Sequence, residues 1–203
     1  MSKQFEQNQK RMKEEHWRVF CAVELPAEIR ARVAAHIAAL RESFPKARAS
    51  WARADALHIT LKFLGEIELA RVEALSQAAR EAAGIESFKL VIEGTGIFPP
   101  RGSPRVLWLG VKDTSGVLSK LQRRLDEECA RVGFARETRE FHPHLTVARL
   151  RAPAEARELA AVHREMKFER AAFAVKDLVV MRSELGAGGS RYTAVSRHEL
   201  REG

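Results

Sequence analysis

The apolar positions of the chain predict four amphipathic helices. In residues 26–44 the apolar side chains recur three or four residues apart, as on one helix face, and Pro26 suits a first turn. Segments 66–83, 114–132 and 153–166 follow the same period. The side chains expected to face inward are Ile29, Val33, Ile37, Leu40, Phe44, Leu69, Val72, Leu75, Ala79, Val117, Leu121, Leu125, Cys129, Val132, Leu159, Val162 and Met166.

Residues that favour helix ends stand at the borders of these segments. The hydroxyl of Thr114 can cap the third helix, and Pro153 suits the first turn of the fourth. Gly84 and Gly133 follow the second and third helices, where glycine readily ends a helix. The helices therefore have predicted limits as well as predicted faces.

Between the helices lie segments with the composition and period of β-strands. Residues 88–92 carry an apolar side chain at every second position, as expected for a half-buried strand. Residues 94–104 are rich in glycine and proline and predict a loop, and the glycines of 186–189 predict a turn. The predicted strands are 17–24, 57–64, 88–92, 105–111, 141–150, 173–181 and 191–197.

The order of these elements predicts an α+β fold. Strands and helices are interleaved without strict alternation, and no glycine-rich phosphate loop joins a strand to a helix. No internal linker divides the chain, so we expect residues 17–203 to form one domain. Residues 1–16 are polar, of mixed charge and without the apolar stretch of a secretion signal, which indicates a charged N-terminal extension.

A four-residue motif occurs twice. His58-Ile-Thr-Leu61 and His144-Leu-Thr-Val147 both read His, apolar, Thr, apolar, and each precedes a turn and a predicted helix. The two copies begin 86 residues apart, close to half of the chain without its extension. Two accidental copies would occur in roughly one of a thousand chains of this composition. The repeat therefore indicates an internal duplication, with two lobes related by a pseudo-twofold axis.

Strand geometry gives the repeat a chemical meaning. Residues at i and i+2 of a strand point to the same face, so His58 lies beside Thr60 and His144 beside Thr146. Two such lobes facing each other would place two imidazoles and two hydroxyls around one cleft.

This arrangement suits displacement at phosphorus. One group must activate the nucleophile on one side, and another must protonate the leaving oxygen on the opposite side. Two histidines with an ordinary pKa of about 6.5 can divide these tasks at neutral pH. The hydroxyls of Thr60 and Thr146 and the guanidinium of Arg149 can donate to the non-bridging oxygens. The spacing alone does not say which histidine is the acid.

A metal site is an alternative use of the same residues. His142 and His144 share a strand face and, with His58, could supply three ligands. Neither motif contains a carboxylate, and threonine stands where further ligands would be expected, which argues against this reading. We therefore interpret His142 as a residue of the cleft edge or a spacer. The remaining histidines, interpreted as surface or packing residues, are His16, His36, His163 and His198.

Composition and charge indicate which kinds of molecule the protein binds. The net charge of +8 favours an anionic partner such as nucleic acid or a phosphorylated small molecule, although a basic surface without a special partner has the same composition. A non-catalytic RNA-binding module is a second functional class. The chain has no RNA-recognition aromatic signature, however, and such a module gives no reason for the duplicated motif.

The cysteines and the apolar runs bear on the location of the protein. Cys21 and Cys129 are far apart and lie in apolar surroundings, so we expect buried free thiols in a reducing compartment. No run approaches the roughly 18 apolar residues of a membrane span. The expectation from these features is a cytoplasmic protein without a membrane partner.

Five segments together resemble the 2H phosphoesterase superfamily, and within it the LigT-like RNA 2′,3′-cyclic phosphodiesterases, also called 2′-5′ RNA ligases. Residues 57–65 (LHITLKFLG) and 141–149 (FHPHLTVAR) match the two histidine motifs of that family closely. The other segments are 18–26 (RVFCAVELP), 104–110 (PRVLWLG) and 183–192 (SELGAGGSRY). The resemblance spans nearly the whole chain from Arg18 to the last strand, and its specificity lies in the combination.

The resemblance implies a bilobal α+β fold in which antiparallel sheets line a central cleft and helices pack outside. It implies hydrolysis of an RNA 2′,3′-cyclic phosphate end to a 2′-phosphomonoester without a metal. We also expect a monomer that uses no cofactor. His58 would be the proton donor to the departing 3′ oxygen, and His144 the proton acceptor that activates water. Thr60, Thr146 and Arg149 would bind the phosphate.

Some members of this family also join RNA ends through a 2′-5′ linkage. The same two histidines could run that reaction with a ribose 5′-hydroxyl in place of water, so ligation of tRNA halves is the nearest alternative. The chain departs from the family pattern in its charged extension before Trp17 and at His142, a position where the family varies. The extension affects no catalytic residue.

Overall fold

The computed structural model describes residues 15–151, 153–186 and 189–202, and within these ranges the chain forms two antiparallel sheets and four α-helices. The first sheet has the order β3 (His58–Glu68), β1 (His16–Glu24), β8 (Asp177–Gly186) and β9 (Gly189–Glu199). The second has the order β2 (Ala49–Trp51), β6 (His144–Leu150), β5 (Val106–Lys112), β4 (Phe88–Phe98) and β7 (Ala171–Val175). Most of the predicted extension, residues 1–14, lies outside the described residues.

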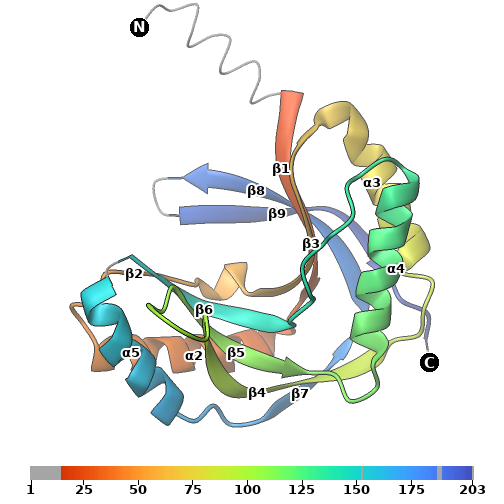
Figure 1. Cartoon of the computed structure of the whole chain (residues 1–203). Helices are drawn as coiled ribbons and strands as arrows, with labels where there is room; N and C mark the ends of the chain where they lie inside the picture. Colours follow the sequence, from red (N-terminus) through yellow and green to blue (C-terminus); the bar gives the residue numbers. More distant parts are fainter. Residues whose placement is uncertain (1–14, 152, 187–188, 203) are drawn as a thin grey trace, which may run out of the picture.

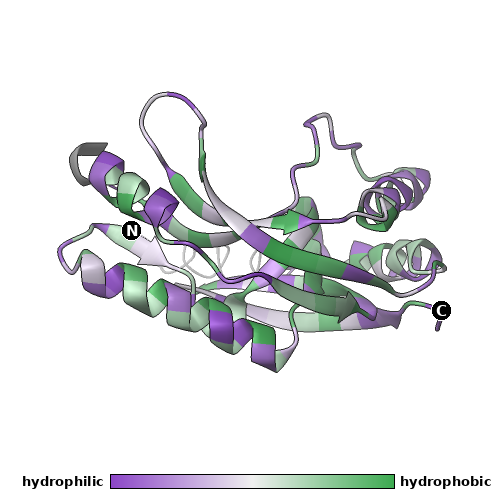
Figure 2. Ribbon diagram, turned by 90° about the horizontal axis from the view of Figure 1, so that it is seen from below, coloured by the Kyte–Doolittle hydropathy of each residue, from purple (hydrophilic) through white to green (hydrophobic). Residues whose placement is uncertain are grey.

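The helices form one pair beside each sheet (Figure 1). α3 (Val72–Ala82) and α4 (Val117–Arg131) pack against the four-stranded sheet, and α2 (Ala27–Ser43) and α5 (Pro153–Glu165) accompany the five-stranded one. The strands between the helix pairs carry much of the apolar sequence (Figure 2). The predicted inward residues that are buried include Ile29, Val33, Ile37, Leu40, Leu75, Ala79, Leu121, Leu125, Cys129 and Leu159.

The two sheets are built in the same way. The order β3-β1-β8-β9 corresponds strand by strand to β6-β5-β4-β7, with β2 added at the outer edge of β6. The helix after β1 packs in the opposite lobe, as does the helix after β5, whereas the helices after β3 and β6 stay beside their own sheet. This correspondence is the pseudo-twofold duplication that the repeated motif predicted.

The second predicted helix begins six residues too early. Residues 66–68 continue β3, and a short 3-10 turn, η2 (Leu69–Arg71), precedes α3. Leu69, expected to face inward, is therefore outside the helix and 44% exposed. The pairing of Glu66 and Glu68 with β1 outweighs their helix propensity, as tertiary context commonly does.

The predicted strand 173–181 is two strands in two different sheets. β7 ends at Val175 beside β4, and β8 begins at Asp177 beside β1, so the chain crosses between lobes at Lys176. Both strands are rich in apolar residues and few residues separate them, so their sequences read as one apolar run. The predicted loop 94–104 is also shorter, because β4 continues through a bulge to Phe98.

Two of the predicted helix ends differ in detail. Asp113, not Thr114, serves the start of α4, since its carboxylate accepts hydrogen bonds from the amides of Ser115 and Leu118 at 3.1 and 2.7 Å. Gly133 has the expected positive φ of 82°, but Gly84 does not adopt that conformation. Residues 187–188 of the predicted glycine turn lie outside the described part of the chain.

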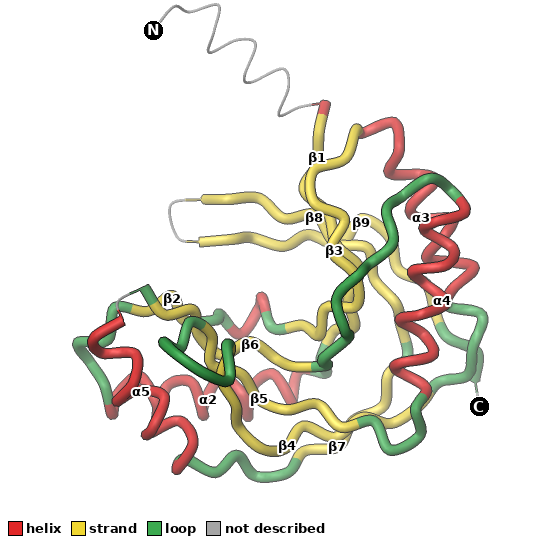
Figure 3. Tube along the Cα trace, viewed as in Figure 1, coloured by secondary structure: helices red, strands yellow, loops and turns green. Residues whose placement is uncertain are grey.

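A buried ion pair joins β3 to α4 and to the loop that follows α4. Lys62 Nζ donates to Asp126 Oδ1 at 2.5 Å and to the carbonyl oxygen of Ala135 at 2.7 Å. The same carboxylate oxygen of Asp126 accepts the amide of Glu137 at 2.9 Å. This loop leaves the top of α4 and runs to the start of β6 in the other lobe (Figure 3). The ion pair therefore fixes the path of the chain toward His144.

We expect Asp126→Asn to lower the free energy of unfolding by about 3 kcal/mol, because it leaves the buried Lys62 ammonium without an anion. Urea denaturation followed by circular dichroism measures the loss. The double variant Lys62→Met/Asp126→Asn should recover part of it, whereas Arg131→Gln, at an exposed ion pair, should change little. A loss below about 1 kcal/mol in Asp126→Asn would contradict this account.

Candidate active site

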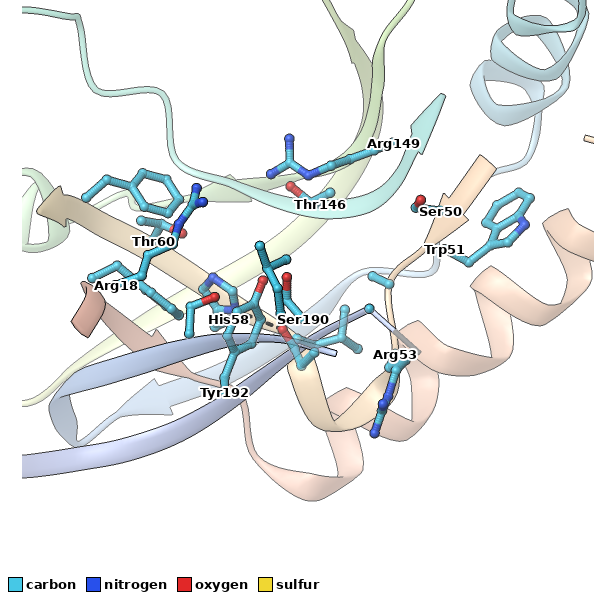
Figure 4. A pocket seen from close by; sticks show the side chains of 18 of the residues that line it. Arg18, Ser50, Trp51, Arg53, His58, Thr60, Thr146, Arg149, Ser190 and Tyr192 are labelled. Atoms are coloured by element: carbon cyan, nitrogen blue, oxygen red, sulfur yellow. Dashed lines mark hydrogen bonds between the residues drawn. The ribbon is translucent and has the colours of Figure 1, made fainter. Parts of the chain in front are cut away.

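The two histidine motifs meet at one cavity between the sheets. The cavity has a volume of about 740 Å³, and its lining includes His58 and Thr60 from β3 with His144, Thr146 and Arg149 from β6. Figure 4 shows Thr60 and His58 on one strand facing Thr146 and Arg149 on the other. The structure thus brings together all five residues that the sequence singled out.

Burial of the alternate residues orients each motif. Ile59 and Leu61 are buried in the hydrophobic core, as are Leu145 and Val147 of the second motif. The histidines and threonines between them are only half-buried and face the cavity. Because successive strand residues point to opposite faces, fixing the apolar set in the core fixes the polar set in the cleft.

A bulge interrupts both motif strands at the same place. On β1, Cys21 pairs with Lys62 and Ala22 pairs with Thr60, so Leu61 has no partner residue on that strand. In the second lobe Val147 likewise has no partner residue on β5, because it lies between the partners of Leu107 and Trp108. A bulge of one residue exchanges the faces of the residues beyond it.

The bulges bring the fifth residue after each histidine to the cleft. These residues are Phe63, which is 53% exposed, and Arg149, and both line the cavity. Strict alternation would have turned Arg149 away from His144 and Thr146. The sequence placed it correctly through its closeness to the motif, but gave no reason for its orientation and did not mark Phe63.

Both histidines are held in the same tautomer. His58 Nδ1 lies 2.8 Å from the carbonyl oxygen of Ala56, and His144 Nδ1 lies 2.7 Å from that of His142. A carbonyl oxygen only accepts, so each Nδ1 carries a proton and donates it. Proton exchange at each ring is therefore left to Nε2.

The surroundings of the rings lower the pKa of both histidines. Burial is the largest cause for His58 and for His144, and the positive charge of Arg149 lowers the pKa of both further. The carboxylate of Glu24, opposite His58 in the β1–β3 pairing, acts in the other direction and raises the pKa of His58. The pKa of His144 has no such carboxylate influence and is lowered by His142 as well.

Aromatic rings surround each histidine, but only one set lines the cavity. The rings of Phe20 and Tyr192 lie 4.7 and 5.0 Å from that of His58, and both residues line the cavity together with Phe63. His144 instead packs against Phe98 and Trp108, at 5.0 and 6.4 Å, which are not among the described lining residues. Sequence reasoning missed the aromatic side of the cleft, because its residues come from three separate strands.

The alternative three-histidine metal site does not assemble in the described residues, where no group of three possible ligands converges. His142 is exposed, with Nε2 3.5 Å from a carboxylate oxygen of Glu140. Its carbonyl oxygen accepts the hydrogen bond from His144 Nδ1. The other histidines pack as expected, since His36, His163 and His198 are buried. Both cysteines are buried free thiols. None of the helices in the described ranges is long and apolar enough to cross a membrane.

Comparison with known proteins identifies the family. The model of the 2′-5′ RNA ligase superfamily matches residues 26–187. The chain belongs to this superfamily. It is 34% identical over 180 residues to the RNA 2′,3′-cyclic phosphodiesterase of Methanothermobacter thermautotrophicus, which covers 87% of this chain and 95% of that protein. It is 32% identical over 183 residues to the enzyme of the same name from Escherichia coli, covering 90% and 96%.

Solved structures show the same fold. The structure of TT0787 from Thermus thermophilus superposes with a TM-score of 0.73 at 27% identity, covering 91% of this chain and 98% of that one. E. coli LigT complexed with 3′-AMP superposes with a TM-score of 0.71 at 30% identity, covering 93% and 100%. The predicted fold class and family are therefore confirmed.

We expect Arg149→Gln to raise the pKa of both His58 and His144, because it removes a positive charge that disfavours both imidazolium forms. NMR titration of the histidine ring resonances measures the shifts. Arg18→Gln is the matched control, since Arg18 lines the same cavity but is not among the charges that shift either pKa. Unmoved titrations of both histidines in Arg149→Gln would contradict the electrostatic picture.

Proposed function

We propose that this protein hydrolyses RNA ends carrying a 2′,3′-cyclic phosphate to 2′-phosphomonoesters. The observation that carries the proposal is the pair of histidines from duplicated strands, held in one tautomer with Nε2 available at a shared cavity. Relatives that match most of this chain are named RNA 2′,3′-cyclic phosphodiesterase. We further propose that residues 17–203 act as one unit and as a monomer, because a single chain supplies both halves of the site.

In the proposed reaction His144 Nε2 takes a proton from a water molecule, whose oxygen forms a bond to phosphorus. The bond between phosphorus and the 3′ oxygen breaks, and His58 Nε2 gives its proton to that oxygen. The phosphate stays on the 2′ oxygen. No step needs a metal ion, because two imidazoles provide both proton transfers.

Two observations support His58 as the acid. Glu24 raises the pKa of His58 alone, so among the two rings this one has a neighbour that favours the protonated form. The departing 3′ oxygen also remains attached to the ribose, so the acid must lie on the side of the nucleoside. The cavity-lining rings of Phe20, Phe63 and Tyr192 gather on that side and offer faces for a nucleobase.

The charged and polar donors stand on the phosphate side. Thr60 and Thr146 occupy matching positions in the two lobes, and Arg149 extends from the same strand as Thr146. In the proposal their donors bind the non-bridging oxygens, where negative charge increases in the transition state. Charge-assisted hydrogen bonds of this kind stabilise the transition state more than the ground state.

The test is incubation of EDTA-treated protein with a short RNA that ends in a 2′,3′-cyclic phosphate. A 2′-phosphate product is expected, separated from the 3′ isomer by chromatography. A second RNA with a 5′-hydroxyl, added in a parallel reaction, tests for 2′-5′ ligation. A 3′-phosphate product, or activity only after metal is restored, would overturn the proposed mechanism.

We expect His58→Ala and His144→Ala each to lower kcat by about 10²–10⁴-fold, the usual contribution of a general acid or base. Circular dichroism should show that both variants stay folded. His142→Ala is the matched control on the same segment and should lower the rate far less, because its exposed side chain makes no proton transfer and the variant keeps the carbonyl group that orients His144. A rate close to wild type in His58→Ala or in His144→Ala would contradict the acid–base assignment.

The pH dependence of kcat/KM should be bell-shaped, because His144 must be neutral while His58 is protonated. Since both pKa values are lowered from the ordinary value, the maximum should lie on the acid side of about pH 6.5. Glu24→Gln removes an influence that raises the pKa of His58, so the alkaline limb should move to lower pH. Asp177→Asn, which also loses a partner of Arg197, is the control. Movement of the acid limb alone in Glu24→Gln would reverse the assigned roles.

A further inference from the structure

Positive charge lines the cavity well beyond the two histidines. Of the described residues that line it, five are arginines and none is an aspartate or glutamate. The arginines are Arg18, Arg41, Arg53, Arg149 and Arg151. Cations gathered in a concave site without anions repel one another, and an anionic ligand relieves that repulsion.

Most of these arginines have no anion of their own. Arg53 forms a two-point ion pair with Asp55, with nitrogen–oxygen distances of 3.0 and 2.5 Å. The other four form no ion pair with any carboxylate in the described part of the chain. Arginines that have a carboxylate partner outside the cavity include Arg32, Arg131, Arg139, Arg182 and Arg197. Four of the five arginines in the cavity therefore keep a positive charge that no carboxylate of the described residues pairs with.

Three of the arginines form a group at the β2 end of the cavity, which we call the arginine arm: Arg41, Arg53 and Arg151. Arg41 lies in the last turn of α2, and Arg53 lies between β2 and the 3-10 turn η1 (Ala54–Ala56). Arg151 follows β6, and its amide donates to the carbonyl oxygen of Arg48 just before β2. Figure 4 shows Arg53 on the side of His58 opposite to Arg18.

The arm begins where the phosphate-binding part of the site ends. Ser50 of β2 is the cross-strand partner of Arg149, so β2 lies directly beside that arginine. Arg151 stands two residues further along the chain, a distance of about 7 Å for an extended strand. A single phosphate held by Arg149 and the two threonines leaves Arg41 and Arg151 of the arm without an anion. A neighbouring phosphate of the same RNA strand would supply one.

We propose that the arginine arm binds the phosphodiester backbone of the nucleotides that precede the cyclic phosphate. The preferred substrate is then an RNA strand, and a 2′,3′-cyclic mononucleotide is a poorer one. The inference rests on the proposed function, because it takes the cyclic phosphate to lie between the histidines. Arginine contacts to phosphates position a strand without reading its bases, so the arm gives length preference and no sequence preference.

The test compares an RNA of about six nucleotides ending in a 2′,3′-cyclic phosphate with 2′,3′-cyclic AMP. The variant is Arg41→Gln/Arg53→Gln/Arg151→Gln. The matched control, Arg80→Gln/Lys120→Gln/Arg123→Gln, removes the same charge from exposed positions on α3 and α4 that do not line the cavity. The measured quantity is the ratio of kcat/KM for the RNA to kcat/KM for the mononucleotide, at several salt concentrations.

We expect this ratio to fall by about tenfold or more in the arm variant, through KM, and to stay near wild type in the control. The salt dependence of binding should become less steep by about 0.7 per lost phosphate contact. A wild-type enzyme without preference for the RNA, or an equal fall in both triple variants, would overturn the proposal. A fall on both substrates with an unchanged ratio would overturn it too.

Failure of the proposed function is a separate outcome. If the wild-type protein turns over neither substrate, the reaction is wrong, and the arm is then judged by fluorescence anisotropy with the same RNA labelled at its 5′ end. Weaker binding in the arm variant than in the control supports the arm as an RNA site. Equal binding by both variants rejects it.

Discussion

The register between each motif strand and its neighbour is the constraint on which the site depends. Burial of Ile59 and Leu61 in the core allows only one face of β3 to reach the cleft, and a slip of one residue would bury His58 instead. The bulge at Leu61 then changes that register and turns the next residues to the opposite face. In β6 the same change aims Arg149 at the phosphate side of the cleft. Two apolar side chains and one unpaired residue in each lobe thus define the polar site.

Duplication supplies two equivalent histidines, and the reaction needs two that differ. The strand order, the bulge and the Nδ1 hydrogen bond are the same in both lobes. The two histidines differ because different residues surround them in the two lobes. Glu24 faces His58 where Gly110 faces His144, and the fifth residue is Phe63 in one lobe and Arg149 in the other. The side of the cleft near His58 therefore has a carboxylate neighbour and aromatic rings, and the side near His144 is cationic. This difference suits a nucleoside beside His58 and phosphates beside His144.

The sequence predicted what depends on local pattern. The helix faces, the duplicated lobes and the five residues of the cleft follow from periods of 3.6 and 2 and from one repeated motif. It could not predict the crossing at Lys176, because two apolar strands in succession read as a single apolar run. It also missed Tyr192 and Arg41, which lie far from either motif in the sequence, and Arg53 and Arg151, which lie near a motif but belong to no repeated pattern. Strands and a helix that are distant along the chain bring these residues to one cavity, and no local pattern encodes that.

The bulge in β3 also links the two halves of the site physically. By turning Phe63 toward the cleft it turns Lys62 the other way, into the buried contact with Asp126 and with the carbonyl group of Ala135. That contact fixes the loop from α4 to β6, whose end carries the His142 carbonyl group that orients the ring of His144. A single irregularity in the strand of one histidine therefore contributes to the position of the other. The two rings need a fixed mutual geometry for in-line displacement, and the shared support of β3 and the loop provides it without a direct contact between them.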